Sequence, residues 1–81
     1  MPTAFYDSGF RFFFYSSDGL EPRHVHVEKG VGGETGKWWL EPTVRLARPT
    51  KLGTRDQNAV RKIILARRRE LIDAWNTHFG A

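Results

Sequence analysis

Residues 9–15 read Gly-Phe-Arg-Phe-Phe-Phe-Tyr, and this aromatic run predicts a strand of a β-sheet. Alternation along the strand would place the even-numbered phenylalanines on one face and Arg11, Phe13 and Tyr15 on the other. Large side chains on both faces indicate a strand that is well covered by the rest of the protein.

A second strand is predicted at residues 24–28, His-Val-His-Val-Glu, because apolar and polar residues alternate strictly there. The two valines are expected to face the core, which leaves His24, His26 and Glu28 together on the opposite face.

Two more short strands are predicted at residues 37–40 and 43–48. Residues 30–36 contain four glycines and are predicted to form the hairpin loop before the first of these strands. Adjacent tryptophans on a strand point to opposite faces, so one of Trp38 and Trp39 is expected in the core and the other as a partly exposed anchor for a partner.

Apolar residues then recur with helical spacing from residue 54 to about residue 79, before Gly80. The pattern predicts one long C-terminal helix packed on one face of the sheet. With a strand-rich segment at residues 4–48, the sequence predicts a single α+β domain over residues 1–81, with a three- to four-stranded antiparallel sheet.

The composition limits the classes of function. The chain has 81 residues, enough for one modest core, and it has no cysteine, which excludes disulfides, thiol redox chemistry and cysteine-based zinc sites. The sequence shows neither a signal peptide nor an apolar run of roughly 20 residues, so the expectation is a cytoplasmic protein that does not bind membranes.

The charge is basic and unevenly distributed. Thirteen Lys and Arg residues against nine Asp and Glu residues give a net charge of +4, and residues 45–69 hold nine basic residues with Asp56 as their only acid. This suits an acidic partner, either nucleic acid or a protein, although exposed helical cations also serve solubility alone. The candidate binding residues are Tyr15, Trp38, Trp39, Arg55, Arg61, Lys62, Arg68 and Arg69.

Three segments, Arg11–Ser16, Pro22–Val27 and Arg69–Trp75, resemble the bacterial domain of unknown function family 4160. Members of that family often have two prolines before the first histidine, and Arg23 replaces the second here. The resemblance implies a two-gene module with a small protein of family 2442, similar to a toxin–antitoxin pair. It therefore implies a cognate small protein as partner, and it supplies no mechanism. Nucleic acid, which the charge suggests, and a second copy of the chain are the alternative partners.

The histidine strand leaves three interpretations open. In a small metal-independent ribonuclease, His24 or His26 would be the general base and Arg11 would stabilise the phosphate charge. In a metal-binding domain, His24, His26 and Glu28 would be the ligands. In a structural interaction domain, the histidines would bond to backbone or line an interface. No complete catalytic or cofactor signature is present, so a binding module without a cofactor is favoured over an enzyme.

Overall fold

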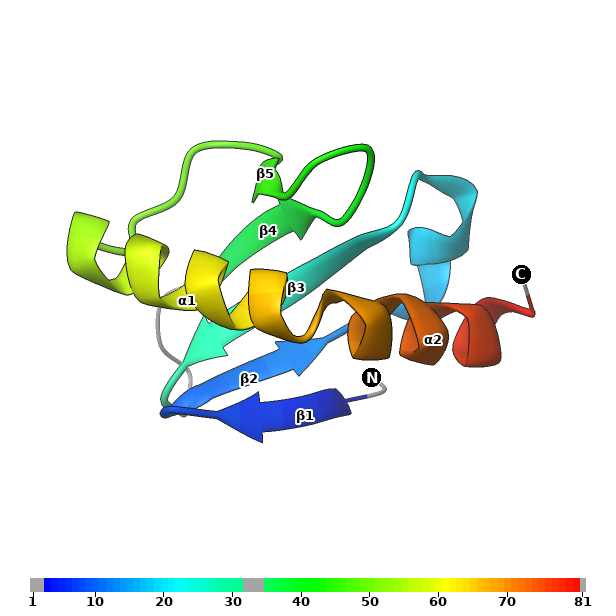
Figure 1. The fold of residues 1–81 in the computed structure, drawn as a ribbon, viewed down its shortest axis with the longest axis horizontal. Helices are drawn as coiled ribbons and strands as arrows, with labels where there is room; N and C mark the ends of the chain where they lie inside the picture. Colours follow the sequence, from blue (N-terminus) through cyan, green and yellow to red (C-terminus); the bar gives the residue numbers. More distant parts are fainter. Residues whose placement is uncertain (1–2, 32–34, 81) are drawn as a thin grey trace.

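The computed structural model describes residues 3–31 and 35–80, and it is an α+β domain built on one antiparallel sheet (Figure 1). The spatial order of the strands is their order in the sequence. The predicted hairpin loop at residues 30–36 lies partly outside the described residues, but the two strands that flank it are paired. The strands are β1 (Thr3–Asp7), β2 (Phe10–Phe13), β3 (His24–Lys29), β4 (Thr35–Trp39) and β5 (Arg45–Leu46).

The sheet has five strands and not the predicted three to four, because the prediction omitted β1. This strand pairs with β2 through a two-residue turn in which Ser8 and Gly9 have φ values of 53° and 85°. Two consecutive positive φ angles are the geometry of a type I′ hairpin, which usually carries Asn-Gly or Asp-Gly. A serine in the first position gives a weak hairpin signal.

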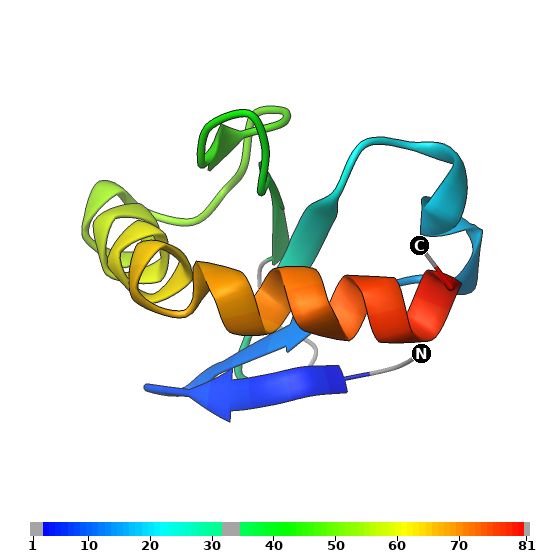
Figure 2. The same cartoon turned by 45° about the vertical axis from the view of Figure 1, so that its right-hand side comes forward.

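The predicted single helix is also wrong, because the segment forms α1 (Thr54–Ala66) and α2 (Arg68–Phe79). Both helices cover the same face of the sheet, and their axes run in different directions (Figures 1 and 2). The break is at Arg67, whose φ and ψ are −115° and 22°. Its guanidinium lies 3.4 Å from the Phe5 ring centre and contacts Asp7 at 3.1 Å, so β1 holds the chain at this point.

The core lies between the sheet and the two helices. Val25 and Val27 are fully buried, as predicted for the core side of their strand, and Trp38 is 1% exposed. A side chain at Gly36 would collide with the Trp38 indole, so glycine is required there. The helices contribute four buried residues to this core: Val60, Ile64, Leu71 and Trp75.

The 3₁₀ helix η1 (Ser16–Leu20) connects β2 to β3. Asp18 is its only buried residue, and the Asp18 carboxylate accepts a 2.8 Å hydrogen bond from the Tyr15 backbone N–H. At its other end Gly19 lies against Phe79 of α2, which leaves no room for a side chain. The helix η1 is therefore fixed between the end of α2 and the start of β3.

We expect Arg67→Gln to destabilise the fold more at neutral pH than in acid. The Arg67 guanidinium contacts Asp7 and Glu70, and these contacts hold both carboxyl pKa values below their usual range, with the Ser8 hydroxyl as the larger cause at Asp7. A carboxyl group whose pKa is lowered by folding stabilises the fold above its unfolded pKa, near 3.8 for Asp and 4.5 for Glu, and loses that effect as the pH falls.

Urea unfolding of wild type and variant at pH about 7 and about 3 measures this difference. The exposed Arg69, which approaches Asp73 at 3.4 Å, provides the matched control Arg69→Gln, with little expected effect at either pH. An Arg67→Gln deficit of equal size at both pH values would show that the two carboxylates are not involved.

Candidate functional site

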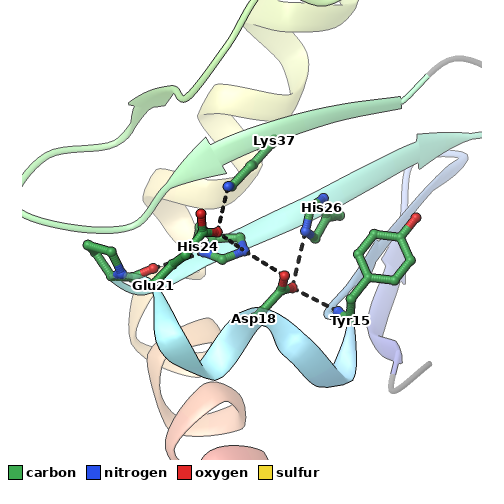
Figure 3. Close-up of polar contacts among 7 residues, drawn as sticks. Tyr15, Asp18, Glu21, His24, His26 and Lys37 are labelled. Carbon is green, nitrogen blue, oxygen red and sulfur yellow. Dashed lines mark hydrogen bonds and ion pairs between the residues drawn. The ribbon is translucent and has the colours of Figure 1, made fainter.

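Two histidines of β3 and one aspartate of η1 form a buried polar cluster on the side of β3 opposite the core valines. Asp18 lies between the two rings, with Oδ1 3.2 Å from His24 Nε2 and Oδ2 3.1 Å from His26 Nε2 (Figure 3). One ligand-type atom from each of the three residues lies within 4.8 Å of the others. The strand brings the two rings together because residues two apart share a face, and η1 supplies the carboxylate.

The backbone fixes the tautomer of His24. Its Nδ1 lies 2.8 Å from the Pro22 carbonyl oxygen, which can only accept a hydrogen bond, so Nδ1 carries the proton. In the neutral ring, Nε2 therefore presents a lone pair toward the Asp18 carboxylate. Within the part of the chain that the structure describes, neither His24 Nε2 nor His26 Nε2 makes a well-aligned hydrogen bond, although both atoms are buried.

Burial and neighbouring groups act together on the pKa values of His26 and Asp18. His24 has no exposed surface and His26 is 6% exposed. Burial lowers the pKa of His26 by more than the neighbouring Asp18 carboxylate raises it. Burial also acts to raise the pKa of Asp18, but the Tyr15 N–H and the two histidines outweigh it and the net direction is down. The favoured state at neutral pH is thus an ionised Asp18 beside a neutral His26.

Glu21 and Lys37 adjoin the cluster (Figure 3). The Lys37 ammonium donates a 2.7 Å hydrogen bond to Glu21 Oε1, which lies 3.7 Å from His24 Nε2. That hydrogen bond is the main reason the pKa of Glu21 is lowered. Lys37 also lies 4.8 Å from the ring centre of Trp39.

Glu28, which the sequence suggested as a third metal ligand, pairs instead with Arg11 of the neighbouring strand at 3.4 Å. The Arg11 guanidinium lies over the Phe13 ring, and that ring stacks on His26. The structure therefore joins His24 and His26 to Asp18, which the sequence analysis did not select. The available signal was the turn between the two predicted strands, because paired strands bring their connecting segment over the start of the second.

The ribonuclease interpretation needs a histidine that reaches a ribose hydroxyl. In this arrangement His24 has no access to solvent, and Arg11 lies over Phe13, away from His24. Arg23, another basic residue beside the histidines in sequence, binds Asn76 at 2.8 Å and Glu41 at 3.1 Å. The cluster thus directs its two buried histidines at the Asp18 carboxylate.

The predicted binding residues fall on different surfaces. Trp38 is in the core, whereas Trp39 is half-buried and Tyr15 is 40% exposed. Arg68 is half-buried and donates a 2.7 Å hydrogen bond to the Leu40 carbonyl. Arg69 is exposed and approaches Asp73.

Two further basic residues, Arg45 and Arg61, line a space between β5 and α1. We call this space the basic groove; its volume is about 340 Å³, and Arg45, Arg61, Gln57 and Asn58 line it above Trp38. Within residues 3–31 and 35–80, no carboxylate lies within 4.0 Å of the six exposed cations in the segment from Arg45 to Lys62, while Asp56 pairs with Lys29 at 2.7 Å. These cations are Arg45, Arg48, Lys51, Arg55, Arg61 and Lys62.

A family described as Domain of unknown function (DUF4160) has a model that matches residues 9–76, most of the chain. No curated protein and no solved structure matches the chain. Among the described residues, neither α1 nor α2 is long and apolar enough to span a membrane.

Proposed function

We propose that this chain, which belongs to the DUF4160 family, is a nucleic-acid-binding component of a two-gene module resembling a toxin–antitoxin pair. The observation that carries the proposal is the set of six exposed cations in the segment from Arg45 to Lys62, two of which line the basic groove, with no carboxylate partner within the described residues.

Unpaired cations favour a polyanion. A solubilising helix face usually interleaves charges of both signs, whereas the segment from Arg45 to Lys62 contains a single acid, Asp56, which already binds Lys29. Arg45 of β5 and Arg61 of α1 both line the groove, and guanidinium groups pair with phosphate oxygens through two parallel hydrogen bonds. The side-chain amide of Asn58 adds a donor and an acceptor of the kind that contact sugars and bases, while Gln57 Nε2 donates a 2.7 Å hydrogen bond to the Leu52 carbonyl.

Binding also agrees better than catalysis with the burial of the histidines. A nucleic acid on the basic groove would contact exposed side chains of β5 and α1, while His24 and His26 have almost no exposed surface. We therefore propose nucleic-acid binding first and ribonuclease activity only as the second candidate function.

The double variant Arg45→Glu/Arg61→Glu tests the proposal. We expect it to bind a labelled 20-nucleotide RNA and a 20-base-pair DNA at least about 30-fold more weakly than wild type, because two phosphate contacts are replaced by repulsion. Fluorescence anisotropy measures the affinity. Arg69→Glu is the matched control, since it reverses an exposed helical charge away from the groove lining, and it should retain most of the affinity.

Equal binding by wild type and the groove variant would contradict the proposal. Failure of wild type to bind either probe, together with binding to an acidic protein ligand, would assign the basic groove to a protein partner instead.

We further propose that the cognate small protein of the module binds the sheet near β1. Here Tyr6 is 73% exposed and Val31 is fully exposed, and with Arg11 and Glu28 they line a shallow hollow of about 470 Å³. Co-purification of the chain with the product of the adjacent gene tests this, and Tyr6→Glu should abolish it without changing nucleic-acid binding.

A further inference from the structure

The buried cluster of Asp18, His24 and His26 does not line the basic groove, and the proposed nucleic-acid binding does not use it. From its geometry we propose that the cluster binds one divalent transition-metal ion of the Zn²⁺ class, with Glu21 as the fourth ligand. The ion would fix η1, through Asp18, to the start of β3.

The spacing of the donor atoms fits tetrahedral coordination. With metal–ligand bonds of about 2.0–2.1 Å, neighbouring ligand atoms of a tetrahedron are about 3.3 Å apart. The two distances from Asp18 oxygens to the histidine Nε2 atoms are 3.2 and 3.1 Å, and Glu21 Oε1 lies 3.7 Å from His24 Nε2. The first two distances end on different Asp18 oxygens, Oδ1 and Oδ2, and ligand atoms of the three residues lie within 4.8 Å of one another, so binding draws the side chains together around the ion.

Among the described residues, the two histidine donor atoms lack other partners. Both Nε2 atoms are buried without a well-aligned hydrogen bond, in side chains that are at most 7% exposed. A lone pair on His24 Nε2 facing a carboxylate oxygen is repulsive unless a proton or a metal ion lies between them. A metal ion would satisfy both nitrogens and Asp18 at once, whereas one proton can serve only one of the nitrogens.

The surroundings of the ligands are those of a metal site. Ligating histidines commonly donate their second N–H to a carbonyl group, as His24 does to Pro22 at 2.8 Å. Asp18 is likewise oriented by the Tyr15 N–H at 2.8 Å. Aromatic rings surround the histidines and keep water away. The ring centre of Tyr15 lies 4.6 Å from that of His26, and the ring centre of Trp39 lies 5.6 Å from that of His24.

The chemistry of the set selects the metal. Two imidazoles and two carboxylates suit Zn²⁺ or Co²⁺, while Mg²⁺ prefers oxygen ligands and retains its water. Two carboxylates also balance the charge of a divalent ion, which a buried site requires. The Lys37 ammonium already holds Glu21 and would orient its carboxylate from outside.

The experiment is a Zn²⁺ titration of the tag-free chain by calorimetry at neutral pH, with Co²⁺ as a spectroscopic probe. We expect one ion per chain, a rise in the unfolding temperature, and the visible absorption bands of tetrahedral Co²⁺. Mg²⁺ should produce neither effect. A wild-type chain that takes up no Zn²⁺ and gives no tetrahedral Co²⁺ spectrum overturns the proposal without recourse to any variant.

Variants assign the ligands. Asp18→Asn and His26→Gln keep the size of the side chain and should weaken Zn²⁺ at least about 100-fold, and Glu21→Gln about 10-fold. His78→Gln, which removes the exposed histidine of α2, should bind like wild type. Circular dichroism of each metal-free variant confirms its fold. Zn²⁺ binding that survives in Asp18→Asn and His26→Gln but is lost in His78→Gln would overturn the assignment.

Discussion

Replacing Trp38 by alanine is expected to lower the free energy of unfolding by about 3–5 kcal/mol, a large share of the stability of an 81-residue domain. The Trp38 side chain is 1% exposed and lies in the core beside β5, where Leu46 is its cross-strand neighbour. Its removal would leave a cavity that the surrounding strands and α1 cannot close. Urea denaturation followed by circular dichroism measures the change.

Trp39→Ala is the matched control, because Trp39 is the next residue of β4, has the same side chain and points to the opposite face of the strand. Trp39 is half-buried and contacts the Lys37 ammonium and the His24 ring, so its loss is expected to lower the free energy of unfolding by only about 1 kcal/mol. The reverse order of the two losses would mean that β4 is shifted by one residue, since such a shift exchanges the two faces of a strand.

The elements that the sequence predicted best are those whose pattern is local. The alternation in residues 24–28 and the aromatic run at residues 9–15 correspond to β3 and to β2 with its extension. The division of these residues between two faces is also observed, because Phe13 lies opposite His26 in the pairing of β2 with β3. A period of two residues is visible in any short strand that is buried on one side.

The elements that were missed depend on distant residues. Helical periodicity continues through Arg67, and the break there reflects contacts with Phe5 and Asp7 at the other end of the chain. The strand β1 is short and follows no regular alternation, so its place in the sheet comes from the Ser8–Gly9 turn and from pairing with β2.

The candidate site was predictable only in part. The two histidines were expected to share a face because they are two residues apart on a strand, and they do. Asp18 was not expected, since its approach depends on the course of η1. Glu28 was expected, but Arg11 of the neighbouring strand engages it. Such pairs depend on the register between neighbouring strands, and the pattern of a single sequence does not determine that register.

The affinity for nucleic acid is expected to fall steeply with salt. Each phosphate contact releases bound counterions, so the logarithm of the association constant falls with the logarithm of salt concentration by about 0.9 per contact on duplex DNA. If about four of the six unpaired cations engage phosphates, the affinity should decrease about 100-fold between 50 and 200 mM salt. The groove variant Arg45→Glu/Arg61→Glu should make about two fewer phosphate contacts, so its slope should be shallower by about 1.8.

Nucleic-acid binding through the basic groove is therefore tested by the anisotropy of a labelled 20-base-pair DNA titrated with the chain at a series of salt concentrations. A slope near −3.5 for wild type, and a slope nearer −2 for the groove variant, would agree with binding through the basic groove. Equal slopes for the two proteins, or no binding at 50 mM salt, would contradict it.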